Sequence, residues 1–232
     1  MSSVTLKSAP SYTITETSES FTIQRNGAPV KTPAGAPLIV PTSALAQAIA
    51  EELSLSRIAA GEGTPLLQLA SLALDIVAKK RGQTIDQILA YAGSELLCHR
   101  ADQPPELAEE QDKIWQPLLV WCAQRLNAPL RTSTGIVPIV QPPASLQNLR
   151  RAITAHDDFR LAGLAQAAGV SGSLVLGLAL AEKYLTAGQA FAAAECDAAH
   201  QMKKWGEDPA AAARLASIRR DLEICERWFG LL

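Results

Sequence analysis

Few residues in this chain combine the types and the spacing that metal or enzyme chemistry requires. Cys196 and His200 lie four residues apart, which would place a thiol and an imidazole on one face of a helix, as in zinc sites. Two ligands in an alanine-rich helix do not complete such a site, so we expect no metal and no cofactor. The pair still supports one alternative interpretation, a helical enzyme of unknown class that binds a metal or a small molecule.

Other titratable residues are more simply interpreted as structural. Asp157 and Asp158 follow His156 and are typical of a helix N-terminus, where negative charge is favourable. Asp75 stands in an otherwise apolar segment and is predicted to be a buried, hydrogen-bonded carboxylate with a structural role. The sequence contains no GxxxxGKS or GxxxxGKT phosphate loop, no GxSxG and no HExxH. These patterns favour a binding protein without catalytic residues.

The composition predicts a folded, helix-rich chain. It has 232 residues, of which 48% are hydrophobic and 19% charged, and this excludes disorder along the whole length. The formal net charge of -2 argues against nucleic acid as a partner, because binding to phosphates requires a basic surplus or stripe. The cysteines at positions 98, 122, 196 and 225 are widely spaced, so we expect free thiols in a reducing compartment.

Neither a membrane span nor a secretory signal is expected from the sequence. No apolar run approaches the roughly 18 residues that a bilayer requires. The N-terminus lacks the basic region and the apolar region of a signal peptide. We therefore expect no membrane insertion and a cytoplasmic location.

The first 41 residues are predicted to form a small antiparallel β domain. Residues 12–15 and 21–24 alternate apolar with polar side chains and are rich in β-branched residues. Asn26 and Gly27 tolerate positive φ and suit a two-residue hairpin turn, with the return strand expected at residues 30–32. A further short strand is expected at residues 38–40.

From Thr42 onward the apolar period changes to about 3.6 residues, which is typical of helices. Thr42 or Ser43 is expected to cap the first helix, Gly61 and Gly63 to end it, and Gly82 to break the second. Helices are predicted at residues 42–60, 65–80, 84–92, 105–126, 145–155, 157–168, 173–186, 189–205 and 209–232, with a crossing loop at 129–143. We thus expect an α+β fold, with a small N-terminal antiparallel β domain at residues 1–41 and a larger all-helical domain at 42–232.

Four segments resemble one protein family in their order and spacing. They are residues 26–38 (NGAPVKTPAGAPL), 91–100 (YAGSELLCHR), 111–121 (QDKIWQPLLVW) and 201–207 (QMKKWGE). The chain resembles the assembly chaperones that bind the alpha subunit of the ATP synthase catalytic head in mitochondria and alphaproteobacteria. The resemblance implies a bacterial chaperone that shields the apolar subunit interface of free alpha until the hexamer assembles. It makes alpha a transient partner, and we expect the free chaperone to be monomeric.

One set of candidates for binding this client lies near the C-terminal segment. Asp197, Gln201 and Trp205 recur at four-residue steps and would form one stripe on a helix, followed by Glu207. The alternative is a solvated helix face that ends in one packed Trp. Relatives usually carry acidic residues at the positions of Ala198 and Ala199, so Asp197 alone keeps the negative charge here.

The remaining candidates lie in the two middle segments. Trp115 and Trp121 are six residues apart, so one is expected in the core and the other nearer an interface. Tyr91, Glu95 and Arg100 combine an aromatic ring with two charges. For these three residues the alternative is a hydrogen-bond network at a helix end, with Glu95 paired to Arg100.

Overall fold

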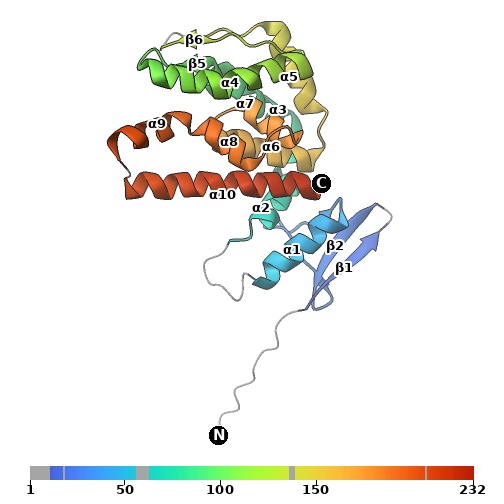
Figure 1. Ribbon diagram of the computed structural model, residues 1–232. Helices are drawn as coiled ribbons and strands as arrows, with labels where there is room; N and C mark the ends of the chain where they lie inside the picture. The colour runs from blue at the N-terminus through green and yellow to red at the C-terminus, as the bar shows by residue number, and fades with distance from the viewer. Residues whose placement is uncertain (1–10, 18, 56–62, 136–138, 207) are drawn as a thin grey trace.

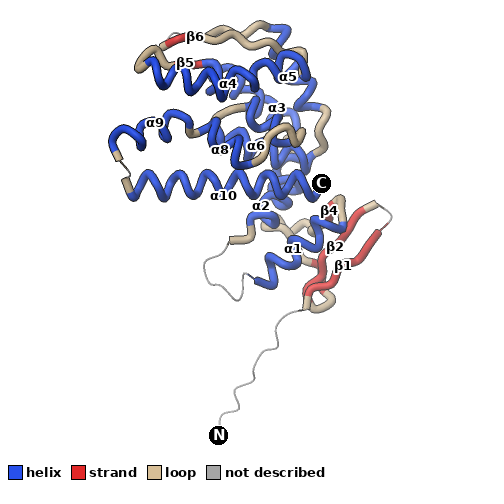
Figure 2. The backbone as a smooth tube through the Cα atoms, viewed as in Figure 1, coloured by secondary structure: helices blue, strands red, loops and turns tan. Residues whose placement is uncertain are grey.

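An antiparallel hairpin begins the fold. The computed structural model describes residues 11–17, 19–55, 63–135, 139–206 and 208–232. Strand β1 (Tyr12–Thr17) pairs with β2 (Ser20–Arg25), which places Ile14 opposite Ile23. On its other edge β2 pairs with β3 (Ala28–Pro29) and β4 (Ile39–Val40). Figure 2 shows that this sheet holds most of the strand content of the described chain.

The predicted turn is confirmed, but the return strand begins earlier than expected. Asn26 and Gly27 have φ values of 51° and 81°, and a turn with two positive φ values matches the twist of a hairpin. A two-residue turn places Ala28 directly opposite Arg25. The return strand therefore starts at Ala28–Pro29, earlier than predicted, and Val30 still donates to the Ile23 carbonyl of β2 at 2.8 Å.

Helix α1 (Ser43–Leu55) packs against β1 and β2 and covers one face of the sheet (Figure 1). Thr42 caps this helix, because its hydroxyl accepts a hydrogen bond from the backbone N–H of Leu45 at 3.1 Å. The same hydroxyl donates to the carbonyl of Leu231 at 2.6 Å, near the C-terminus. This hydrogen bond joins the start of α1 to the C-terminal helix. Gly61, which was expected to end α1, lies outside the described residues.

A second link joins the β region to the helices through Asp75. Helix α2 (Pro65–Leu72) continues into a π-helical turn, η1 (Ala73–Val77), which contains this residue. Asp75 accepts from the Thr32 hydroxyl at 2.8 Å and from the backbone N–H of Ala34 at 3.2 Å. It is half-buried rather than buried, and its hydrogen bonds hold the loop before β4 against the helices.

The break in the second predicted helix falls before Gly82. Lys80 has φ −132° and ψ 36°, which are not helical values, and helix α3 (Arg81–Ala90) starts directly after it. Gly82 therefore lies in the first turn of α3 and does not break a helix. Two short 3₁₀ segments, η2 (Tyr91–Ser94) and η3 (Leu96–Cys98), follow α3.

The rest of the helical region is built around the buried helix α7 (Leu174–Ala181). Helices α4 (Pro105–Arg125), α6 (Asp158–Ser171), α8 (Ala187–Ala194) and α10 (Pro209–Leu231) contact α7, while α5 (Pro143–Thr154) packs on α3. Strand β5 (His99–Arg100) pairs in parallel with β6 (Ser133–Thr134) from the crossing loop. The two parts of the α+β fold share one hydrophobic core.

Two predicted helices differ in extent from the observed ones. The helix expected at residues 189–205 is divided into α8 and α9 (Cys196–Trp205), because Glu195 leaves helical geometry with φ −110° and ψ 25°. The helix expected at residues 173–186 ends at Ala181, and Lys183 adopts a left-handed φ of 58° soon afterwards. Cys98, Cys122, Cys196 and Cys225 are free and buried, as expected. In the described part of the chain, no helix has both the length and the apolar character needed to cross a membrane.

Candidate functional site

The side chain of Gln111 connects α4 to α9. Gln111 is only 1% exposed, and its Nε2 donates a hydrogen bond to Asp197 Oδ1 at 2.7 Å. Its Oε1 accepts from the backbone N–H of Ala101 at 2.7 Å. Asp197, in the first turn of α9, is therefore bound to a buried side chain of α4. Gln111 was not among the predicted site residues, although it lies in the third family-like segment.

Arg100 and Trp115 lie beside this connection. The indole N–H of Trp115 donates to the carbonyl of Ala193 at 2.8 Å, and the Arg100 guanidinium lies 5.3 Å from the centre of the Trp115 ring. Arg100 Nη1 is buried and has no hydrogen-bond partner, although Asp112 Oδ1 lies 3.8 Å away. Burial lowers the pKa of Arg100. Its Nη2 donates a hydrogen bond to Gln116 Oε1 at 3.4 Å, so the cation contacts the Trp115 ring, Gln116 and Asp112.

The C-terminal end of α9 is exposed. Gln201 is exposed, and Trp205 has 73% of its surface accessible to solvent, with Lys204 Nζ 5.6 Å from its ring centre. The alternative prediction of one packed Trp at the end of the stripe is therefore wrong for Trp205. Glu207 lies outside the described residues.

Glu95 is buried far from solvent and is not paired with Arg100. It is 1% exposed, and its carboxylate accepts from the backbone N–H groups of Leu174 at 2.9 Å and Val175 at 3.2 Å. The hydroxyl of Ser173 also donates to it. These donors lie at the N-terminus of α7, where a helix favours negative charge. Burial nevertheless raises the pKa of Glu95 to about 7. The carboxylate stabilises a helix start in the core and is not available to a client.

Trp115 and Trp121 are both buried, so neither ring is presented on the surface of the free chain. Trp121 stacks on Tyr184, with ring centres 5.1 Å apart and planes 17° apart. Tyr184 itself is partly exposed, at the turn after α7. The two Trp residues of α4 therefore contribute to the packing of the helical region.

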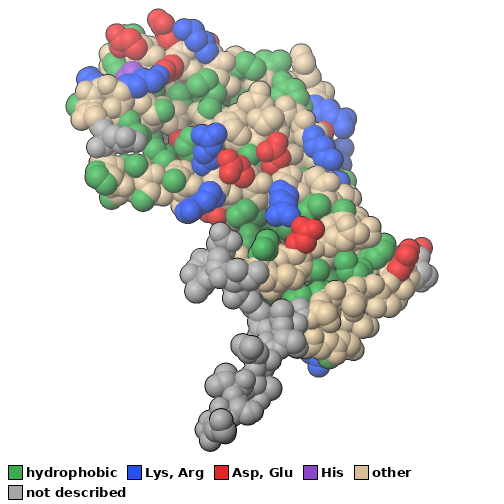
Figure 3. All heavy atoms as spheres, turned by 60° about the horizontal axis from the view of Figure 1, so that its bottom comes forward, with side chains coloured by type: hydrophobic (Ala, Val, Ile, Leu, Met, Phe, Trp, Pro, Cys, Tyr) green, Lys and Arg blue, Asp and Glu red, His purple; other side chains and the backbone are tan. Residues whose placement is uncertain are grey.

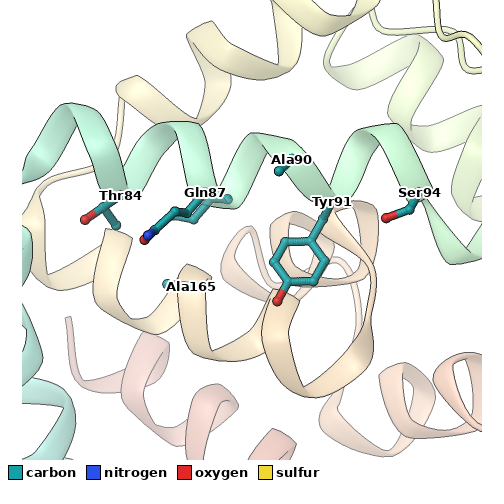
Figure 4. Close-up of a pocket in the computed structure, with 7 residues that line it drawn as sticks. Thr84, Gln87, Ala90, Tyr91, Ser94 and Ala165 are labelled. Atoms are coloured by element: carbon teal, nitrogen blue, oxygen red, sulfur yellow. The ribbon is translucent and has the colours of Figure 1, made fainter.

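Tyr91 lies in a separate surface groove on the side of α3 and α6 (Figure 4). The groove has a volume of about 510 Å³, and Thr84, Gln87, Ser94 and Ala165 also line it. Neither α4 nor α9 contributes to its lining. The structure thus brings Arg100, Trp115 and Asp197 together but leaves Tyr91 elsewhere.

The Cys196 and His200 pair, which supported the metal-binding alternative, lies beside a carboxylate of α4. His200 Nδ1 lies 3.2 Å from Glu110 Oε2 on α4, and Lys203 binds the other oxygen of the same carboxylate. Hydrogen bonds from Lys203 and His200 hold the pKa of Glu110 below its ordinary value. Burial raises the pKa of the Cys196 thiol to about 11, and the side chain is only 3% exposed. In the ranges that the structure describes, no group of three or more His, Cys, Asp or Glu residues is arranged to hold a metal ion.

Comparison with known proteins identifies similar chains. The family model described as ATP12 chaperone protein matches residues 4–123. The crystal structure of Atp12 from Paracoccus denitrificans is 33% identical, with a TM-score of 0.88 and 95% of each chain covered. A mutant of that protein in which an aspartate is replaced by lysine matches equally well. A protein from Agrobacterium tumefaciens, to which a chaperone role is ascribed, is 28% identical, with a TM-score of 0.87 and coverage of 94% of this chain and 83% of that one.

Proposed function

The chain belongs to the ATP12 chaperone family, and we propose that it binds the free alpha subunit of the ATP synthase catalytic head during assembly. The observation that carries the proposal is the similarity to Paracoccus Atp12 over 95% of the chain. It covers the β region and the helical region alike, so the chain has the whole architecture of the family.

The proposed action is binding without catalysis. A subunit that will enter a ring exposes large apolar interface patches before its neighbours arrive, and such patches aggregate. A chaperone that covers one of them keeps the subunit soluble, and the next subunit of the ring then displaces it. The affinity must be intermediate, because a chaperone that bound too tightly would block assembly.

The candidate surface for alpha is the exposed side of α9. Trp205 supports this choice, since a large aromatic side chain that is 73% exposed is typical of a binding hot spot. Gln201 lies one helical turn before it and is also exposed. Asp197 anchors the helix through Gln111, while Arg100 and Trp115 support that anchor from the core.

Co-expression with alpha tests the proposal. The chain is produced together with the alpha subunit of the same ATP synthase, and the soluble fraction is analysed by affinity capture and size-exclusion chromatography. We expect soluble alpha in a complex with the chain, and insoluble alpha when the chain is omitted. Equal amounts of soluble alpha with and without the chain would contradict the proposed function.

A further inference from the structure

An apolar groove lies between α9 and α10, on the side of α9 opposite Gln201. Its volume is about 600 Å³, and residues from α4, α8, α9 and α10 line it. The larger apolar side chains are those of Ile114, Phe191, Met202 and Leu215, and the small residues Ala192 and Ala199 leave room above them.

The groove lies where little of either neighbouring helix is buried in the core. Cys196 is the only buried residue of α9, and the buried residues of α10 begin at Leu222. The first half of α10 and the outer part of α9 therefore extend beyond the core. Gly206, with φ 88°, ends α9 before the chain enters α10. Figure 1 shows α9 and the first part of α10 at one edge of the helical region.

Charged side chains around the groove are neutralised by one another. Glu110 binds Lys203 and His200 on the α4 side. On the α10 side Arg214 pairs with Glu195 at 2.8 Å. Figure 3 shows acidic and basic side chains interspersed on one face of the molecule, with hydrophobic side chains between them.

A further cation, Arg219, lies beside Phe191 of the groove. The Arg219 guanidinium lies 5.8 Å from the centre of the Phe191 ring and pairs with Glu223 at 3.2 Å. The rim therefore offers little unpaired charge to an ionic ligand. A partner complementary to this surface is apolar and uncharged where it enters the groove.

We propose that the groove binds the apolar face of a helix of the alpha subunit, and this rests on the proposed function. Helix-in-groove recognition places apolar side chains into such a channel between two helices. The volume of the groove is enough for several side chains, and a flexible Met on its wall can adapt to them. Because α9 borders the groove and also carries Trp205, one client could contact both surfaces.

Paired double variants test the groove. Ala192→Glu with Ala199→Glu places two charges in its lining, at positions that are exposed in the free protein. Ala213→Glu with Ala216→Glu adds the same charge at exposed positions of α10 that do not line the groove. The probe is the alpha subunit, co-expressed with each variant, and thermal unfolding of each purified variant shows that it is folded.

We expect the groove variant to reduce the amount of soluble complex by about tenfold, and the control to change it by less than about twofold. Met202→Gln, which adds no charge, is a second variant and should reduce complex formation by about threefold. Equal behaviour of the groove and control variants, with an unchanged Met202→Gln protein, would overturn the proposal while the proposed function stands. A wild-type chain that forms no complex with alpha would overturn the proposed function itself.

Sedimentation of the free chain distinguishes the other possible occupant. We expect a monomer at all concentrations for the wild type and for both double variants. A wild-type dimer that the groove variant alone dissociates would assign the groove to a second copy of the chain and overturn the proposal.

Discussion

The amide of Gln111 on α4 donates a hydrogen bond to the carboxylate of Asp197 on α9 at 2.7 Å, although 86 residues separate the two. Gln111 is almost completely buried, and its other polar atom is occupied by the backbone N–H of Ala101. The bond therefore couples the start of α9 to the interior of the protein. It gives Asp197 a positioning role in addition to any contact with a client.

Substitutions at Asp197 should separate these two roles. Asp197→Asn keeps an acceptor for Gln111 but removes the charge, whereas Asp197→Lys replaces the acceptor with a donor. We expect faster amide hydrogen exchange in α9 for Asp197→Lys and for Gln111→Ala, with the far-UV helical signal unchanged. The local destabilisation should be about 1–3 kcal/mol, because a buried polar group loses its partner. Asp197→Asn should exchange like the wild type.

Binding of alpha completes this comparison. If alpha interacts with the negative charge of Asp197, both Asp197→Asn and Asp197→Lys weaken the complex. If only the position of α9 matters, Asp197→Asn binds normally and Gln111→Ala binds weakly. Unchanged binding by Asp197→Lys would place the client surface elsewhere on the molecule.

Trp205→Ala should weaken client binding without lowering stability. The side chain is 73% exposed, so the folded protein loses little buried surface when it is removed. We expect affinity for alpha to fall by about tenfold or more, as at an aromatic hot spot, and the free energy of unfolding to change by less than about 0.5 kcal/mol. Val140→Ala is the control, since Val140 is also exposed but lies in the crossing loop. Similar affinities for the two variants would count against α9 as the client surface.

Gly163→Ala should destabilise the contact between α6 and α10. A Cβ atom at this position would lie 2.5 Å from Trp228 Cδ1 and 2.9 Å from Phe229 Cε1, and both rings are buried. The indole of Trp228 is further held by its hydrogen bond to the carbonyl of Phe159 at 3.0 Å. We expect a loss of about 1–3 kcal/mol in the free energy of unfolding, measured by urea denaturation.

Gly169→Ala on the same helix is the matched control. Its Cβ would meet only the Tyr91 hydroxyl, at an ordinary contact distance of 3.6 Å. Because Ala favours a helix over Gly by about 0.5–1 kcal/mol, this variant should be as stable as the wild type or more stable. A Gly163→Ala protein with wild-type stability would show that α10 can shift away from α6 at little cost.

The periodicity of the sequence was sufficient to predict the fold class, because each hydrophobic pattern depends on local secondary structure. Alternating β-branched residues predicted β1 and β2, and Asn26 with Gly27 predicted the turn that follows. Helix boundaries were less accurate where the break depends on a residue of ordinary type. Neither Lys80 nor Glu195 is a helix-breaking residue, yet the backbone leaves helical geometry at both.

The candidate site was only partly predictable, because its contacts join segments far apart in the chain. Four-residue spacing correctly placed Gln201 and Trp205 on one helix. It could not indicate that Asp197, on the same stripe, bonds to a buried residue of α4. One alternative paired Glu95 with Arg100, which is near in sequence. Apart from the backbone N–H of Leu97, its observed partners lie at residues 173–175, at least 78 residues away. Such pairings follow from tertiary packing.

The buried Glu95 carboxylate should make stability depend on pH. Its pKa in the folded protein is about 7, above the ordinary value of 4.5, because burial disfavours the charged form. Between these two values the folded state binds more protons than the unfolded state. The stabilisation is therefore fully present below about pH 4.5 and is lost as the pH rises through about 7. The expected loss is on the order of 2–3 kcal/mol.

Glu95→Gln isolates this contribution from those of other titrating groups. His156 acts in the opposite direction, since burial lowers its pKa and its protonation at low pH destabilises the folded state. Both proteins contain His156, so the difference between their free energies of unfolding reports on Glu95 alone. We expect the free energy of the wild type relative to Glu95→Gln to decrease from pH 4.5 to pH 7, measured by urea denaturation at fixed ionic strength. A difference that stays constant over this range would show that hydrogen bonds from Ser173 and the start of α7 keep Glu95 ionised.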